Sequence, residues 1–179
     1  MAGHAECLKQ ANTTATQSIS PAIKVQVQDG GGNLVNTATD SITLAINNNP
    51  SGGTLSGTLT VSAVSGEASF SDIAIDAVGS GYTLDATATG LTTATSASFD
   101  IIPGVPVQLA FSVEPTNTAS MATISPAIKV RVEDSGGNLV PAATDSITLA
   151  INNNPGSGTL SGTLTVSAVS GEAVFSGIS

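Results

Sequence analysis

Few side chains in this sequence could take part in catalysis. The single histidine, His4, and the single cysteine, Cys7, both lie close to the N-terminus. A nucleophile needs a base held beside it, and a zinc site needs several Cys or His ligands at defined spacing. Both lie outside the repeated region, and Cys7 has no second His or Cys near it at the spacing of a metal site. We therefore predict no catalytic residue, no enzymatic activity and no cofactor. Cys7 is expected to be a free thiol, which could pair with a second chain in an oxidising setting.

Calcium is the metal that the loop residues would suit best, because it prefers carboxylate, amide and carbonyl oxygens. Two pairs qualify, Asp29 with Asn33 and Asp72 with Asp76. Neither has the spacing of a recognised calcium loop, and a second copy of this region has Gly177 in place of Asp72. Asp and Asn also favour tight turns. The sequence therefore predicts turns at these positions and no metal ligand, with calcium binding left as the alternative.

Two covalent modifications can also be considered. An internal Lys–Asn isopeptide bond requires a buried amine beside a carboxylate. Strand alternation places Lys24 and Lys129 on the face opposite Ile23, so we expect both amines to face solvent and no such bond to form. The triplet Asn12-Thr13-Thr14 fits a glycosylation acceptor, although a three-residue match has little specificity.

The composition excludes several classes of partner. The net charge is −9, with four Lys and Arg residues against thirteen Asp and Glu. A nucleic-acid-binding surface needs a cluster of basic residues, and an anionic membrane surface attracts one. No run of about 18 apolar residues could span a membrane. The first ten residues lack the apolar stretch of a signal peptide. We expect any targeting signal to lie outside this sequence.

The dominant feature is an internal repeat. Residues 18–73 and 123–178 are identical at 46 of 56 positions, with an offset of 105 residues. A period near 100 residues fits one β-sandwich domain per repeat. We divide the chain into a first domain at 1–103 and a second at 104–179, joined by the short sequence Ile102-Pro103-Gly104-Val105-Pro106. Two prolines make this linker stiff.

The two copies differ at their ends. The second copy begins with the alternating segment Val105–Ala119, whereas residues 1–14 match that segment only around Asn12 and Thr13. The first strand of the first domain is therefore atypical. Ser179 corresponds to Ala74, so the second copy contains no equivalent of residues 75–102. We expect the chain to be a section of a longer array.

Period-two alternation indicates an all-β fold. In residues 21–29, Ile23, Val25 and Val27 share one face and Lys24, Gln26 and Gln28 share the other. About seven short strands, with Phe70 facing inward, alternate with turns rich in Gly, Asn and Ser. This pattern predicts a β-sandwich with Greek-key connections. The further strands are expected at residues 41–46, 53–57, 59–64, 67–75, 81–88 and 94–102. Tyr82 follows a sequence typical of a tyrosine corner, in which the hydroxyl bonds to nearby backbone.

These motifs resemble a known family. Val25 to Val35 reads V-x-V-x-D-x-x-G-N-x-V, and I-T-L, G-T-L-S and S-G-E-A-x-F follow it. Together they resemble the bacterial immunoglobulin-like repeats of invasin- and intimin-type surface adhesins. The resemblance implies a rod of stacked immunoglobulin-like sandwiches on the cell surface or outside the cell, in which neighbouring repeats are the partners. Adhesion in that family is usually a property of terminal domains.

The expected function is that of a non-catalytic structural spacer in an extracellular, adhesin-like protein involved in cell adhesion. One alternative is self-assembly, in which the open edge of the second copy accepts a strand from another chain. A second alternative is weak carbohydrate binding. Sugar sites commonly use exposed aromatic side chains, and this sequence has no Trp and one Tyr. These three hypotheses differ in what they require: concentration-dependent mass for assembly, a polar or aromatic groove for glycans, and neither for a spacer.

Overall fold

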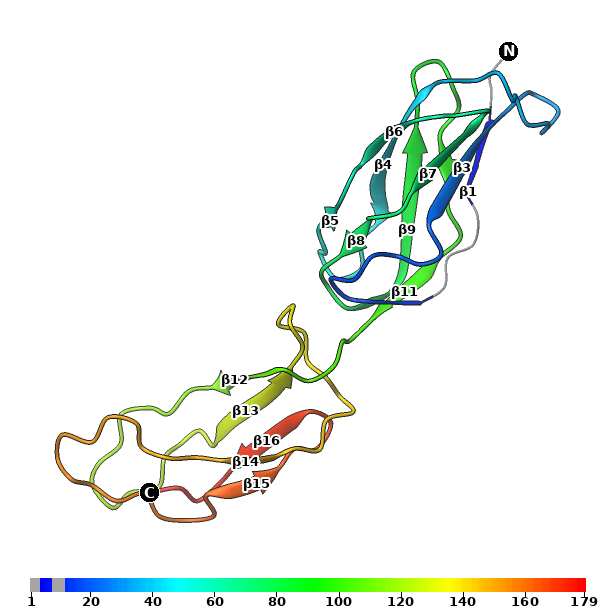
Figure 1. The fold of residues 1–179 in the computed structure, drawn as a ribbon. Coiled ribbons are helices and arrows are strands. Elements are labelled where there is room, and N and C mark those ends of the chain that lie inside the picture. Colours follow the sequence, from blue (N-terminus) through cyan, green and yellow to red (C-terminus); the bar gives the residue numbers. More distant parts are fainter. Residues whose placement is uncertain (1–3, 8–11) are drawn as a thin grey trace. The chain divides into compact units, whose positions relative to one another are not determined.

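The protein is all-β. The computed structural model describes the backbone of residues 4–7 and both the backbone and the side chains of residues 12–179. The described residues form sixteen strands and no helix (Figure 1). A search of these residues for a helix long and apolar enough to cross a membrane found none.

The chain forms two compact units, residues 1–103 and 104–179, each with a hydrophobic core of its own. We refer to them as unit 1 and unit 2.

Unit 1 has two main sheets (Figure 1). The smaller has the order β1 (His4–Cys7), β3 (Ile23–Gln28), β7 (Glu67–Phe70), with antiparallel pairs throughout. The larger has the order β2 (Thr13–Thr14), β11 (Phe99–Ile102), β9 (Gly79–Thr87), β4 (Ser41–Asn48), β6 (Thr60–Ser62), with β10 (Ala94–Thr95) also paired to β9. A short ladder joins β5 (Leu55–Ser56) to β8 (Ala74–Ile75).

The core of unit 1 takes side chains from both sheets. Alternation along β3 buries Ile23, Val25 and Val27, as predicted, and Phe70 of β7 is 1% exposed. From β9, Tyr82 and Leu84 enter the same core. Every second residue of these strands is therefore apolar because it faces the opposite sheet.

Unit 2 repeats the smaller sheet and part of the larger one. β12 (Gln108–Val113), β13 (Ile128–Glu133) and β16 (Glu172–Phe175) form a three-stranded antiparallel sheet. β14 (Ser146–Thr148) pairs with β15 (Thr165–Ser167). β14 is equivalent to the first part of β4, and no strand of unit 2 takes the place of β9.

The structure refines several predicted strands. The strand expected at residues 67–75 is two strands, β7 and β8, and the one expected at 94–102 is also two, β10 and β11. β9 begins at Gly79, two residues earlier than expected. Gln28 does not share the exposure of Lys24: it is only 7% exposed, because the turn after β3 folds back and Leu34 forms a bridge to it. The atypical N-terminal sequence still supplies a strand, since β1 pairs with β3.

Candidate interaction surface

The candidate calcium turn at Asp29 has the geometry of an Asx turn. One carboxylate oxygen of Asp29 accepts the backbone N–H groups of Gly31 and Asn33 at 2.8 and 3.0 Å, and both oxygens accept the Asn33 amide at 3.2 Å. The hydrogen bonds from Asn33 and Gly31 hold the pKa of Asp29 below its ordinary value. The carboxylate thus closes the turn, as the sequence predicted.

Asp134 occupies the equivalent position in unit 2 and has one further role. Its Oδ2 also accepts the N–H of Gly104 at 2.8 Å, and the residue is only 2% exposed. Burial acts to raise the pKa of Asp134, but the N–H groups of Gly104, Asn138 and Gly136 outweigh it, and the net shift is downward. Asp134 therefore fixes the first residue of unit 2 to the turn after β13.

The two carboxylates of the other candidate calcium pair, Asp72 and Asp76, bond to different partners. The carboxylate of Asp72 accepts the Thr58 N–H and, at 2.7 Å, the Thr58 hydroxyl, which lowers its pKa. Asp76 instead accepts the Thr54 N–H at 2.7 Å. Each carboxylate therefore orders a different part of the segment after β4. Within residues 4–7 and 12–179, no cluster of three His, Cys, Asp or Glu side chains suits a metal ion.

The lysines lie at the surface in ion pairs. Lys24 Nζ is 2.7 Å from Glu67 Oε1, and Lys129 Nζ is 3.0 Å from Glu172 Oε1. Both lysine side chains are more than 40% exposed, in agreement with the predicted solvent-facing position. Glu172 also accepts the Ser112 hydroxyl at 2.8 Å, so β12, β13 and β16 are joined on their outer face.

Tyr82 makes the predicted backbone hydrogen bond. Its hydroxyl donates to the carbonyl oxygen of Ala77 at 2.9 Å, and the side chain is fully buried. It therefore offers no surface to a sugar ring. The side chains of His4 and Cys7 lie outside the described residues, whereas Asn12 is exposed.

The open edge that the sequence predicts for the second copy lies on one side of unit 2. In unit 1 this side is covered by β9, β10 and β11, which contribute Tyr82, Leu84, Ala86, Ala94, Phe99 and Ile101 to the core. Unit 2 has no strands equivalent to these three, and apolar residues on this side of it are exposed to solvent. The exposed fractions are 58% for Val107, 56% for Leu109, 48% for Phe111 and 41% for Ile151.

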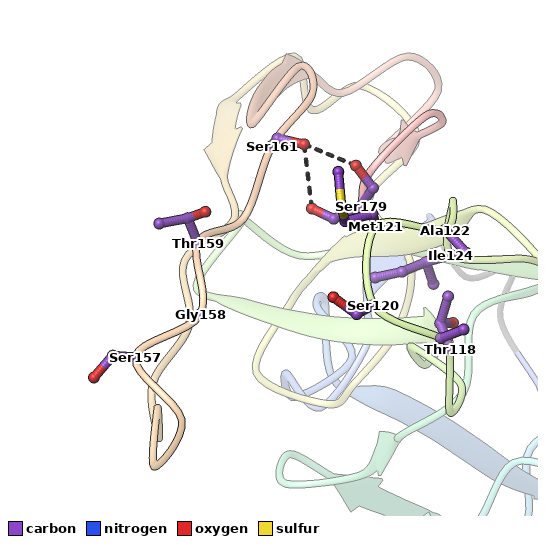
Figure 2. Close-up of a pocket in the computed structure, with 11 residues that line it drawn as sticks. Thr118, Ser120, Met121, Ala122, Ile124, Ser157, Gly158, Thr159, Ser161 and Ser179 are labelled. Atoms are coloured by element: carbon purple, nitrogen blue, oxygen red, sulfur yellow. Dashed lines mark hydrogen bonds between the residues drawn. The ribbon is translucent and has the colours of Figure 1, made fainter.

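A cavity of about 600 Å³ lies at one end of this open side. Figure 2 shows the segment with Ser157, Gly158 and Thr159 on one flank and the segment with Ser120 and Met121 on the other. The Ser161 hydroxyl lies 2.7 Å from that of Ser179 at the margin. A second, smaller hollow of about 280 Å³ lies between β12 and β14.

In unit 1 the counterpart of the large cavity is filled. Gly53, equivalent to Gly158, lies so close to Tyr82 and Ile75 that an added Cβ would be 2.8 Å from the tyrosine hydroxyl oxygen and 2.9 Å from Ile75 Cγ2. A Cβ built on Gly158 meets nothing closer than Asn154 Oδ1 at 3.7 Å. The repeated glycine is the sequence signal for this site. Gly158 is retained in the second copy, whereas that copy contains no equivalents of Ile75 and Tyr82, which pack against Gly53.

Comparison of the sequence with protein-family models gives no match. A search of curated proteins gives none either.

Proposed function

We propose that this chain is a non-catalytic spacer, composed of tandem immunoglobulin-like Greek-key sandwiches, in an adhesin-like protein at the cell surface or outside the cell. The observation that carries the proposal is the pair of near-identical units, each with a separate core. A structure built from such units gains length with each repeat, and each unit contributes its own stability.

The strand order supports the sandwich assignment. β4 and β6 are neighbours in the larger sheet, the chain then crosses to β7 in the smaller sheet, and it returns to place β9 beside β4. Connections that cross between two mainly antiparallel sheets are typical of Greek-key sandwiches. The buried Tyr82, with its hydroxyl bonded to Ala77, is a further feature of that architecture.

The linker supports a spacer role as well. Pro103 has a ring-restricted φ, and the next residue, Gly104, is held to its own unit by Asp134. A short linker that contains proline is typical of a spacer between repeats.

The proposal is tested by measuring molar mass by light scattering after size exclusion, over a wide concentration range and with reductant present. A passive spacer is expected to give the monomer mass at every concentration. A mass that rises with concentration would contradict it. The variant Cys7→Ser, measured without reductant, controls for dimers that form only through the thiol.

A further inference from the structure

The one parallel pair among the described strands joins an early segment of unit 1 to its last strand. Thr13 of β2 lies opposite Ile101 of β11, and Thr14 lies opposite Ile102. The chain enters β2 at its first residue and leaves β11 at its last, towards Pro103. Because parallel strands run in the same direction, tension along the chain pulls β2 and β11 in opposite directions along their own axes. The bonds between them are therefore loaded together, in shear, and not one after another.

The residues after β2 add to this attachment. The Ala15 N–H donates to the Ile102 carbonyl at 2.9 Å, and the Ile19 N–H donates to the Ile73 carbonyl at 2.7 Å. The side chains of Ala15 and Ile19 are each 2% exposed within the core of unit 1. We call residues 13–19 the entry segment. It cannot move along β11 without breaking backbone hydrogen bonds and withdrawing apolar side chains from the core.

The last strand of unit 1, β11, is held at both of its edges. It lies between β2 and β9 in the larger sheet, and Phe99 and Ile101 are at most 3% exposed. The Asp100 carboxylate accepts the Ser80 hydroxyl at 2.5 Å and the Gly81 N–H at 2.9 Å, which fixes β11 to β9. In the sheet order β2 has β11 as its one neighbour. We therefore expect the entry segment to slide before β11 does.

The first strand, β1, precedes the entry segment on the path of the tension. It is an edge strand of the smaller sheet and pairs with β3 through four antiparallel residue pairs. In Figure 1, β1 begins near one end of unit 1 and β11 ends at the other. Tension therefore loads β1 first. After the release of β1, tension reaches Thr13 directly, and the entry segment is then the connection between the incoming chain and β11.

We propose that the parallel pairing of β2 with β11, together with the entry segment, is a mechanical clamp that sets how long unit 1 resists tension before it unfolds. The inference rests on the proposed spacer role for its biological use, since a spacer transmits tension between the parts of a protein that it separates. The resistance itself is a property of unit 1. A failure of the clamp would leave the molar mass unchanged, and self-association would leave a force measurement on single molecules unchanged, so the two tests are distinguishable.

The test is single-molecule unfolding at constant force. One handle is fused to the N-terminus and the other is attached at Val105→Cys, in a Cys7→Ser background, so that the full chain is used but only unit 1 is stretched. Val105 is 75% exposed, which makes this position accessible to the handle. Forced unfolding is governed by the unfolding rate and not by the equilibrium stability. The main step is expected to lengthen the molecule by roughly 30 nm, as the release of residues 13–102 requires at about 3.5 Å per residue.

Ala15→Gly and Ala63→Gly are the matched variants. Both replace a buried alanine of the same core, 2% and 3% exposed, but only Ala15 belongs to the entry segment. Each is expected to shift the unfolding of unit 1 to lower urea concentration, because a buried methyl group is lost and glycine is more flexible. At fixed force, Ala15→Gly is expected to raise the unfolding rate about fivefold or more and Ala63→Gly less than about twofold, because contacts that still hold when the clamp breaks hardly affect that rate.

Ala15→Pro is the stronger variant, because it also removes the N–H that Ile102 accepts, and it is expected to raise the rate at fixed force about tenfold or more. If urea unfolding shows that this variant does not fold, the glycine pair decides alone. Two results would overturn the proposal. One is an equal rise in rate for both glycine variants, which shows that the resistance follows overall stability. The other is an unchanged rate for Ala15→Gly, which shows that β1 or β9 resists the tension.

Discussion

The two units contain the same eleven residues, Asp-Ser-Ile-Thr-Leu-Ala-Ile-Asn-Asn-Asn-Pro, in different surroundings. In unit 1 they include the eight-residue strand Ser41–Asn48, paired with β6 on one side and β9 on the other. In unit 2 only Ser146–Thr148 is a strand, and it pairs with β15 alone. The strand is shorter where the second neighbour is missing.

This difference separates the preference of the residues for extended backbone from the effect of the neighbouring strands. Ile, Thr and Leu favour extended backbone in both copies, but an extended strand needs partners for its N–H and C=O groups. Residues 41–43 and 146–148 have such partners in β6 and β15, respectively. Beyond Thr43 the pairing on the other side continues with β9. The length of this strand is therefore set by its neighbours and not by its own sequence.

The largest expected difference concerns amide exchange. Amides in residues 45–48 should exchange about a thousandfold more slowly than those in 150–153, because the former open only when the core of unit 1 opens. NMR is the suitable measurement, because it distinguishes the two segments by residue. Methods that digest the protein would give peptides of the same sequence from both segments. Similar rates in the two segments would contradict the role assigned to β9.

Leucine truncation should sharpen the comparison. Leu44→Ala removes a buried side chain and is expected to destabilise unit 1 by about 2–5 kcal/mol. Leu149→Ala removes a partly exposed one and should cost unit 2 about 1 kcal/mol. Urea unfolding followed by NMR signals of each unit measures both. Equal losses would mean that Leu149 is covered in solution.

The equivalent glycines should also respond differently. Gly53→Ala places a methyl group against Tyr82 and Ile75 and is expected to destabilise unit 1 by about 1–3 kcal/mol. Gly158→Ala has free space and should change the stability of unit 2 by less than about 0.5 kcal/mol. The same urea experiment compares them. A large loss from Gly158→Ala would show that the cavity is closed in solution.

The smallest effect is expected at the two turn aspartates. Folding lowers the pKa of Asp134. Its ionised carboxylate therefore stabilises the folded state above the ordinary Asp pKa of about 3.9, and this stabilisation is lost as the pH falls through the pKa of Asp134 in the folded state. Asp134→Asn should cost unit 2 about 1 kcal/mol at neutral pH and reduce its loss of stability below pH ~4. Asp29→Asn should cost less, because Asp29 is more exposed and lacks the bond to Gly104. Urea unfolding at several pH values tests this order. An acid profile unchanged by Asp134→Asn would contradict it.

Much of the fold was predictable from alternation alone. The inward face of β3, the burial of Phe70 and the Tyr82 hydrogen bond follow from side-chain period and turn chemistry, which are local properties. The burial of Gln28 and the break between β7 and β8 were not predicted, since they depend on pairing with other segments, Leu34 for Gln28 and β5 for β8.

The open side of unit 2 could be predicted only in part. The repeat showed that residues 75–102 have no second copy, which indicated an open edge. It did not show that Gly158 borders a cavity or that Met121 keeps its backbone conformation. Those facts depend on tertiary packing, which a pairwise sequence match does not contain.

The duplicated segment also has a kinetic consequence. During folding, residues 79–87 could pair with residues 41–48 or with the same sequence at 146–153. Synthesis from the N-terminus resolves this choice, because the second segment is made several seconds after β9, at about 5–20 residues per second. Refolding from urea removes that order. We therefore expect refolded protein, but not protein folded during synthesis, to pass through a misdocked intermediate. Stopped-flow refolding should detect it as a slow phase that a chain ending at residue 103 lacks, and an equal slow phase in both chains would contradict this origin.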